Sequence, residues 1–187
     1  MLPVSLWPTA VCTSWYMKSS KPHLTILEMV LFGMLAALTF ALQVVMSPLP
    51  NIEPVSLLVM LFAVIFGWKS LYPIYIFVVM EILYYGISLW NIYYLYIWTV
   101  LAIAAIFMRK VENPLLWALL SAVFGLMFGA LCGIVDVFMG GPAFAIGKWA
   151  MGIPFDVTHC IGNFVIALVL FQPLRKILHK LYTRVNL

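Results

Sequence analysis

One run of this sequence places a carboxylate among aromatic rings in an otherwise apolar segment. Glu81 is followed by Tyr84, Tyr85 and Ser88 at positions i+3, i+4 and i+7, and this spacing puts all four on one stripe of a helix. A carboxylate in hydrocarbon is costly, so Glu81 should face protein or a water-filled cavity. The stripe therefore predicts a polar cavity near one end of this helix.

A second apolar segment carries a similar polar stripe, made by Asp156, His159 and Asn163 at i, i+3 and i+7. Aromatic walls with a few converging polar groups are what a small organic ligand needs. An interfacial aromatic belt explains many of the rings, and pocket lining is favoured for those that share a stripe with Glu81. The full set of predicted substrate-binding residues is Gln43, Asn51, Glu53, Glu81, Tyr84, Tyr85, Trp90, Tyr94, Asp136, Lys148, Trp149, Asp156, His159 and Asn163.

The usual catalytic and cofactor motifs are broken in this chain. Gly86-Ile87-Ser88 continues with Leu89, so the GxSG motif of rhomboid proteases fails. His159 has no second histidine or cysteine at metal-ligand spacing, and Gly147-Lys148 continues with Trp149, which breaks the phosphate-binding loop pattern. We expect no catalytic residue, metal or bound cofactor. The cysteines Cys12, Cys132 and Cys160 are expected to be free, buried thiols.

Composition places these residues in a membrane. The 187 residues are 66% hydrophobic and 9% charged, with a mean hydropathy of +1.12, which a soluble domain does not reach. Apolar segments of bilayer length predict an all-α integral membrane protein with six transmembrane helices in one compact bundle. We expect the spans at about 25–47, 54–67, 71–88, 91–108, 115–139 and 157–173.

The basic residues predict an orientation. Of the ten Lys and Arg residues, all but Lys148 fall in the chain ends or in the connections between spans 2 and 3 and between spans 4 and 5. This asymmetry predicts a multi-pass protein of the cell (cytoplasmic) membrane with both termini in the cytoplasm. The formal charge of +4 then follows from topology and needs no nucleic acid partner.

Three parts of the chain are expected. Residues 1–24 form a cytoplasmic N-terminal tail, with Met17 as an alternative start, and residues 25–173 form the substrate-binding domain. Residues 174–187 form a basic amphipathic segment at the inner membrane surface.

Small residues form ridges on two of the predicted helices. In the first span, Gly33, Ala37 and Ala41 recur every four residues, almost opposite a polar ridge of Thr39, Gln43 and Ser47. If the polar ridge faces the bundle interior, the small ridge faces lipid or a partner protein, with packing inside the bundle as the alternative. A second ridge, in the fifth span, is expected to pack internally; its members are Ser121, Gly125, Gly129 and Gly133.

The chain resembles the S-components, the substrate-binding membrane subunits of energy-coupling factor (ECF) type ABC transporters for vitamins. The resemblance covers about residues 23–183. It is carried by AxxxA at 37–41, LPNIEP at 49–54, FGWK at 66–69, GIPFD at 152–156, His159 and Gly162-Asn163.

This resemblance implies high-affinity binding of a vitamin from outside and its delivery across the membrane. It also implies that the ridge of Gly33, Ala37 and Ala41 docks on a transmembrane coupling subunit, which two ATPase subunits drive with ATP and Mg. The chain is most similar to the S-components for cobalamin or a related corrinoid, with those for pantothenate, pyridoxine-type vitamins and folate as alternatives. A different class of function, an ion-coupled secondary carrier using Glu81, Asp136 and Asp156, stays open.

Overall fold

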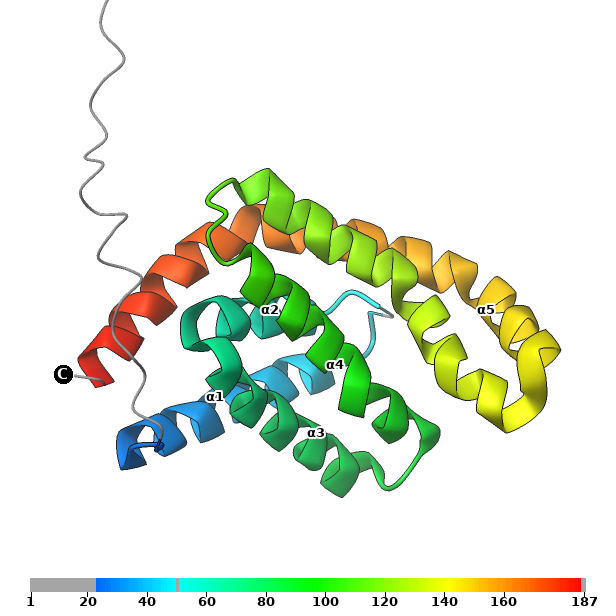
Figure 1. Ribbon diagram of the computed structural model, residues 1–187, viewed down its shortest axis with the longest axis horizontal. Coiled ribbons are helices and arrows are strands. Elements are labelled where there is room, and N and C mark those ends of the chain that lie inside the picture. The colour runs from blue at the N-terminus through cyan, green and yellow to red at the C-terminus, as the bar shows by residue number, and fades with distance from the viewer. Residues whose placement is uncertain (1–22, 50, 186–187) are drawn as a thin grey trace, which may run out of the picture.

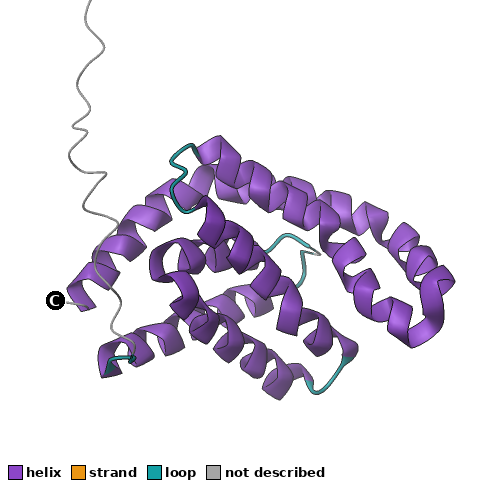
Figure 2. Cartoon of the chain, in the orientation of Figure 1, coloured by secondary structure: helices purple, strands orange, loops and turns teal. Residues whose placement is uncertain are grey.

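The computed structural model describes residues 23–49 and 51–185, and within them it holds helices and no strand (Figure 2). This confirms the all-α class. The elements are α1 (Ile26–Met46), α2 (Val55–Phe66), the short 3-10 helix η2 (Gly67–Ser70), α3 (Leu71–Tyr85), α4 (Leu89–Met108) and α5 (Pro114–Val185). The predictions for the tail, Met17 and Cys12 lie outside the described residues, apart from positions 23 and 24. Cys132 and Cys160 are free thiols, as expected, the first buried and the second half-buried.

Local sequence sets where the helices begin and end. Thr25 and Glu28 form a capping box at the start of α1, and Ser88 and Asn91 form one at the start of α4, so each satisfies backbone N–H groups that have no partner within the helix. Gly86, with a φ of 81°, ends α3 and permits the turn between α3 and α4. Ser88 therefore caps α4, and the expected continuation of the third span through residue 88 is wrong.

The fifth and sixth predicted spans belong to one element, α5, which reverses direction at Gly141 (Figure 1). Gly141 has a φ of 81° and a ψ of 173°, and Pro142 follows at the first position of the returning arm, where proline is favoured. Residues 140–156, expected as a loop, are helical except at this turn. The helix also continues through the C-terminal segment, as far as Val185.

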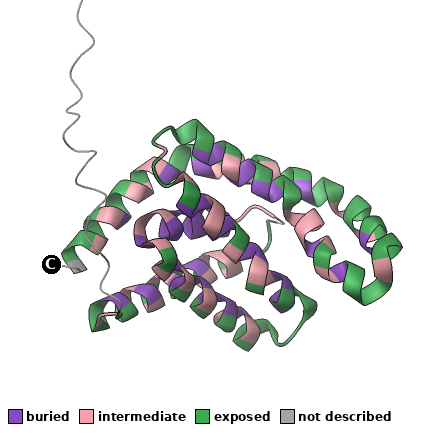
Figure 3. Cartoon of the chain, in the orientation of Figure 1, coloured by how far each residue is buried: buried purple, intermediate pink, exposed green. Residues whose placement is uncertain are grey.

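The middle of the molecule is occupied by α2. Ten of its residues are buried, and it contacts α1, α3, α4 and α5 (Figure 3). This explains a helix of only 12 residues that is apolar on every side. Below the pocket described next, the fully buried Trp98 packs against Phe77, Tyr94, Phe124 and Phe128, with ring centroids 5.3 to 6.4 Å apart.

Within the described residues, four continuous stretches are long and apolar enough to cross a membrane: Ile26–Met46, Val55–Tyr85, Leu89–Met108 and Pro114–Arg184. The second of them joins α2, η2 and α3, and the fourth holds two helical arms that meet at the non-helical Gly141, so six separate spans are not established. Their outward faces carry bare apolar side chains, among them Leu83, Phe107 and Phe138, each at least 80% exposed. Such surfaces suit a protein embedded in lipid.

Basic residues gather at one end of the molecule, which we call the basic end and define by Lys69, Arg109 and Arg175. Lys69 forms an ion pair of 2.8 Å with Glu28 at the start of α1, and the Tyr182 hydroxyl donates to the same carboxylate at 2.8 Å. Arg175 donates to the Arg109 carbonyl at 3.2 Å. The two ends of the described chain therefore lie together at the basic end (Figure 1).

Candidate functional site

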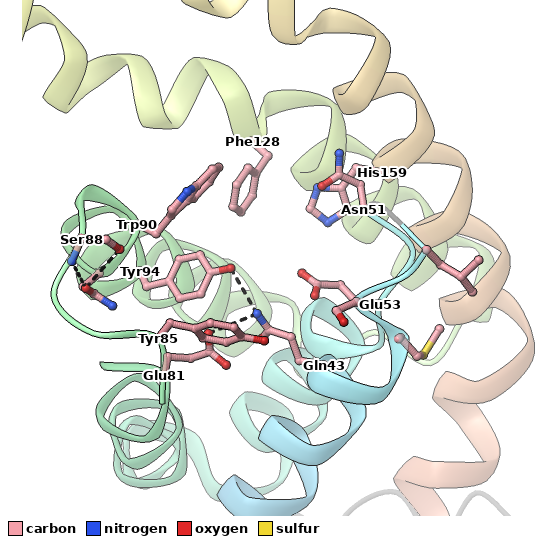
Figure 4. Close-up of a pocket in the computed structure, with 14 residues that line it drawn as sticks. Gln43, Asn51, Glu53, Glu81, Tyr85, Ser88, Trp90, Tyr94, Phe128 and His159 are labelled. Carbon is pink, nitrogen blue, oxygen red and sulfur yellow. Dashed lines mark hydrogen bonds between the residues drawn. The ribbon is translucent and has the colours of Figure 1, made fainter. Parts of the chain in front are cut away.

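A cavity of about 480 Å³ opens at the other end of α1, roughly 22 Å along the helix from Glu28 at 1.5 Å per residue. Residues from every long helix except α2, and from the loop after α1, line this pocket (Figure 4). They are Gln43, Met46, Ser47, Leu49, Asn51, Glu53, Glu81, Tyr85, Ser88, Trp90, Asn91, Tyr94, Phe128 and His159.

Gln43 lies at the centre of the polar part of the pocket. Its Nε2 donates to Oε2 of Glu81 and to the Tyr94 hydroxyl, at 3.4 Å in both cases. These contacts are longer than the usual 2.9 to 3.0 Å of an N–H···O hydrogen bond, so they are weak. Its Oε1 is buried with no hydrogen-bond partner among the described residues, so the amide retains capacity for a ligand.

Two carboxylates line the pocket from different elements. Glu81 on α3 is 5% exposed, and its Oε1 has no hydrogen-bond partner in the described part of the chain. Glu53 comes from the loop between α1 and α2 and is half-buried; Figure 4 shows the two acids on opposite sides of Gln43. Burial, and secondarily repulsion from Glu81, raises the pKa of Glu53 to about 7. The pocket is therefore acidic, and its charge changes near neutral pH.

His159 reaches the pocket from the returning arm of α5. Its ring is 2% exposed and packs edge-on against Phe128, with centroids 5.1 Å apart. Nε2 has no hydrogen-bond partner within the described ranges. A buried polar atom without a partner costs free energy, and in a cavity wall it is an available contact for a ligand.

Aromatic rings close the rest of the pocket. Trp90 and Tyr94 lie one turn apart on α4, with centroids 6.4 Å apart and planes 64° apart. Tyr94 and Phe128 both rest on the buried Trp98, which fixes their positions. Tyr85, at the end of α3, completes this aromatic surface and is 54% exposed.

The loop after α1 is held over the pocket by α5. Asn51 adopts a φ of 59°, a left-handed conformation that asparagine tolerates better than most residues, and its Nδ2 donates to the Phe155 carbonyl at 3.3 Å. Gly162 faces the backbone of this loop, and a Cβ there would lie 3.6 Å from the Asn51 carbonyl oxygen. Asn51 and Ile52, from one of the segments that carry the resemblance, thus contact Phe155 and Gly162 from the other.

Asp136 and Lys148 do not line the pocket. They form an ion pair of 2.8 Å, and the buried Tyr93 joins them, donating to Asp136 at 2.6 Å and accepting from Lys148 at 2.9 Å. This cluster ties α4 to both arms of α5. The structure therefore places these two residues in a cluster beside the pocket that contains Glu81, where Tyr93 joins them.

Asp156 and Asn163 are also absent from the pocket lining, because they join the arms of α5 to each other and to α2. Asp156 accepts from the Gly129 amide at 3.0 Å, and Asn163 donates to the Ser56 hydroxyl and the Ser121 carbonyl, both at 3.1 Å. Their roles in this structure are in helix packing.

The last two predicted residues outside the pocket lining are aromatic. Tyr84 is 61% exposed and packs edge-on against Phe40, 5.4 Å away between centroids. Trp149, on the returning arm of α5, is 40% exposed.

The pocket also includes residues that were not among the predicted set. Met46, Ser47 and Leu49 follow from the end of α1, and Phe128 comes from a stretch with no polar signal. Ser88 and Asn91 had a readable signal, since Ser followed three residues later by a side-chain acceptor marks the start of a helix.

The two small-residue ridges differ in surroundings. Ala37 and Ala41 are exposed, Gly33 is half-buried, and a Cβ on Gly33 would meet nothing within 4 Å, so this ridge faces outward. In the α5 ridge, a Cβ on Gly125 would lie 2.9 Å from the backbone of His159 and one on Gly129 would lie 2.5 Å from Asp156 Oδ2. Internal packing is confirmed there, except at Gly133, which has no such neighbour.

Within the described residues, no group of three or more His, Cys, Asp or Glu side chains could hold a metal ion. Comparisons of the whole chain with protein-family models, curated proteins and solved structures found no match.

Proposed function

We propose that this chain binds a small organic molecule of vitamin size in the pocket and delivers it across the cell membrane as the S-component of an ECF-type transporter. The supporting observation is the cavity of about 480 Å³ in which Gln43, Glu81 and His159 each present a buried polar atom without a partner among the described residues. Ligand pockets are commonly about 300 to 1,000 Å³, apolar, with a few such polar groups.

The cavity volume favours a smaller vitamin than cobalamin. A corrinoid is several times larger than the drug-sized molecules that pockets of this class enclose. Of the substrates implied by the resemblance, pantothenate, the pyridoxine-type vitamins and folate fit this volume better. A corrinoid would have to project from the open mouth of the pocket or displace the loop that carries Asn51 and Glu53.

Two features of the surface support the proposed orientation and the proposed partner. The gathering of basic residues and both described chain ends at one end supports a cytoplasmic position for the termini, and the pocket then opens to the outside. The outward ridge of Gly33, Ala37 and Ala41 is smooth enough for close approach of another helix. We assign it to the coupling subunit, whose two ATPase partners would supply ATP hydrolysis.

The ion-coupled carrier has weaker support. Such a carrier needs acids that exchange protons along one route. Glu81 lines the pocket, whereas neither Asp136 nor Asp156 does. Asp136 is paired with Lys148 and Tyr93 in the neighbouring cluster.

Uptake by proteoliposomes tests this function. The chain would be reconstituted alone and with a coupling subunit and two ATPases, with ATP inside the vesicles. Each preparation would be assayed for uptake of radiolabelled cobalamin, pantothenate, pyridoxine-type vitamins and folate. We expect binding by the chain alone and accumulation only by the full complex. Ala37→Trp should abolish accumulation but keep binding, whereas the same substitution at the exposed Ala150 should change neither. Accumulation by the chain alone in a pH gradient, without ATP, would overturn the proposal in favour of the ion-coupled carrier.

A further inference from the structure

The pocket carries acids and no strong base. Glu53 and Glu81 are among its lining residues, and no Lys or Arg lines it in the described part of the chain. Lys148, which is among the predicted substrate-binding residues, is held by Asp136 and Tyr93 in the neighbouring cluster. An anionic ligand would therefore face two carboxylates with no compensating cation, which is unfavourable in a partly desolvated site.

Two of the three buried polar atoms left open in the pocket are oxygen acceptors, from Gln43 and Glu81. Glu81 is only 5% exposed, and its Oε1 has no hydrogen-bond partner among the described residues. The same is true of Oε1 of Gln43. His159, 2% exposed, adds Nε2, which accepts a hydrogen bond when the other ring nitrogen carries the proton. A ligand that satisfies the two oxygens must donate hydrogen bonds or carry positive charge.

The aromatic surface has the same preference. Trp90, Tyr94, Tyr85 and Phe128 line the same cavity as the acids, and Tyr94 and Gln43 are joined by a hydrogen bond of 3.4 Å (Figure 4). Cations bind over the faces of Trp, Tyr and Phe, and aromatic cages recognise quaternary and protonated amines. A dehydrated inorganic cation would instead need a shell of oxygen ligands, which aromatic rings do not supply.

From this juxtaposition we infer that the pocket selects an organic cation, whose charged nitrogen lies between the carboxylates of Glu53 and Glu81 and against the rings of Trp90 and Tyr94. The inference rests on the proposed function and names its substrate class. It favours the amine form of a pyridoxine-type vitamin, or another positively charged heterocycle, over pantothenate and folate, which are anions.

Calorimetric titration of the purified chain in detergent tests the charge requirement. The probes are phenyltrimethylammonium and its neutral isostere tert-butylbenzene, which differ in the charged nitrogen. We expect the cation to bind at least tenfold more tightly than the isostere, and Glu81→Gln or Glu53→Gln to weaken the cation at least tenfold while leaving the isostere unchanged. Glu112→Gln removes an exposed carboxylate outside the pocket and should change neither. The melting temperature of each variant establishes that it folds.

A panel of vitamins sorted by charge separates the two proposals. If pantothenate or folate binds, if Trp90→Ala abolishes that binding, and if phenyltrimethylammonium does not compete, the pocket is a vitamin site and the cation inference is overturned. If no cationic, neutral or anionic vitamin binds the folded wild type, the proposed function itself fails. Equal affinities for phenyltrimethylammonium and its isostere would also overturn the inference.

Discussion

Gln43 on α1 and Glu81 on α3 meet across the floor of the pocket, where Nε2 of the amide lies 3.4 Å from Oε2 of the acid. The other oxygen of each side chain is buried and has no partner among the described residues. Two neighbouring polar groups thus leave acceptors free at one point of an apolar surface. Because a closed protein core would satisfy these atoms, we interpret the pair as the polar anchor of a ligand.

Replacing Gln43 tests this anchor. Gln43→Leu keeps the approximate volume but removes both the unpartnered oxygen and the donor that faces Glu81 and Tyr94. We expect binding of the cationic ligand to weaken about tenfold, or about 1.4 kcal/mol, with little change in melting temperature. The same substitution at Gln172, which donates to the Glu112 carbonyl, should leave the affinity unchanged. Unaltered affinity in Gln43→Leu would exclude this anchor.

Binding should depend on pH through Glu53. Its pKa is raised to about 7, so the side chain is mainly protonated below pH 7 and charged above it. The groups that line the pocket with it are Glu81 and Tyr85 of α3, Tyr94 of α4 and His159 of α5. A cation requires the carboxylate, so we expect affinity to be about tenfold weaker at pH 6 than at pH 8. Glu53→Gln should remove most of this dependence, and affinity that falls with rising pH would contradict it.

The same shift affects the stability of the unliganded protein with opposite sign. Between the ordinary pKa of 4.5 and the raised value, the folded state holds a proton that the unfolded state has lost. The contribution of Glu53 to stability is therefore lost as pH rises from about 4.5 to 7. We expect the melting temperature of the wild type to fall, relative to that of Glu53→Gln, as pH rises over this range. A difference that does not change with pH would show that another group dominates.

Helix packing in α5 predicts a contrast between two glycines. A Cβ at Gly125 would lie 2.9 Å from the backbone of His159 and Cys160, whereas one at Gly133 would meet nothing within 4 Å. We expect Gly125→Ala to destabilise the protein by about 1 to 3 kcal/mol, since overpacking costs this much, and Gly133→Ala to be neutral or slightly stabilising. Melting temperatures in detergent measure both, and equal values would refute close packing of the arms.

The ion pair at the basic end should matter for stability. Lys69 and Glu28 are 13% and 1% exposed, and removing one partner leaves the other charge buried. We expect Lys69→Met to cost about 3 to 5 kcal/mol. Tyr182→Phe, which removes only one hydrogen bond to Glu28, should cost about 0.5 to 1.5 kcal/mol. The substitution Lys176→Met, at an exposed lysine, is the control. A loss of stability in this variant as large as in Lys69→Met would show that the ion pair makes no specific contribution.

Much of the fold could be predicted because the determining signals are local. Apolar length and composition predict helices, and the all-α class is confirmed. Continuity between segments was less predictable: Gly141 reverses α5 within two residues, so the loop expected at 140–156 is helix. Gly followed by Pro marks a turn in sequence, but it does not tell how far the helices extend on either side.

The candidate site was predictable where a stripe on one helix led into the cavity, as for Glu81 and Tyr85. Sequence spacing did not predict the pocket lining where a polar side chain is paired with a residue on another helix. Asp136 pairs with Lys148, and Asn163 with Ser56 and Ser121, and these contacts join residues far apart in the sequence. The spacing along one helix carries no information on which residues from other helices will face it.

Native mass spectrometry of the purified chain measures the central claim most directly. Wild type would be incubated with the charge-sorted vitamin panel and compared with the Glu81→Gln and Glu112→Gln variants. We expect one cationic species of vitamin mass to remain bound to the wild type and to Glu112→Gln, and to be lost from Glu81→Gln. Equal retention by all three proteins, or no retained small molecule on the folded wild type, would contradict a ligand site built around Glu81.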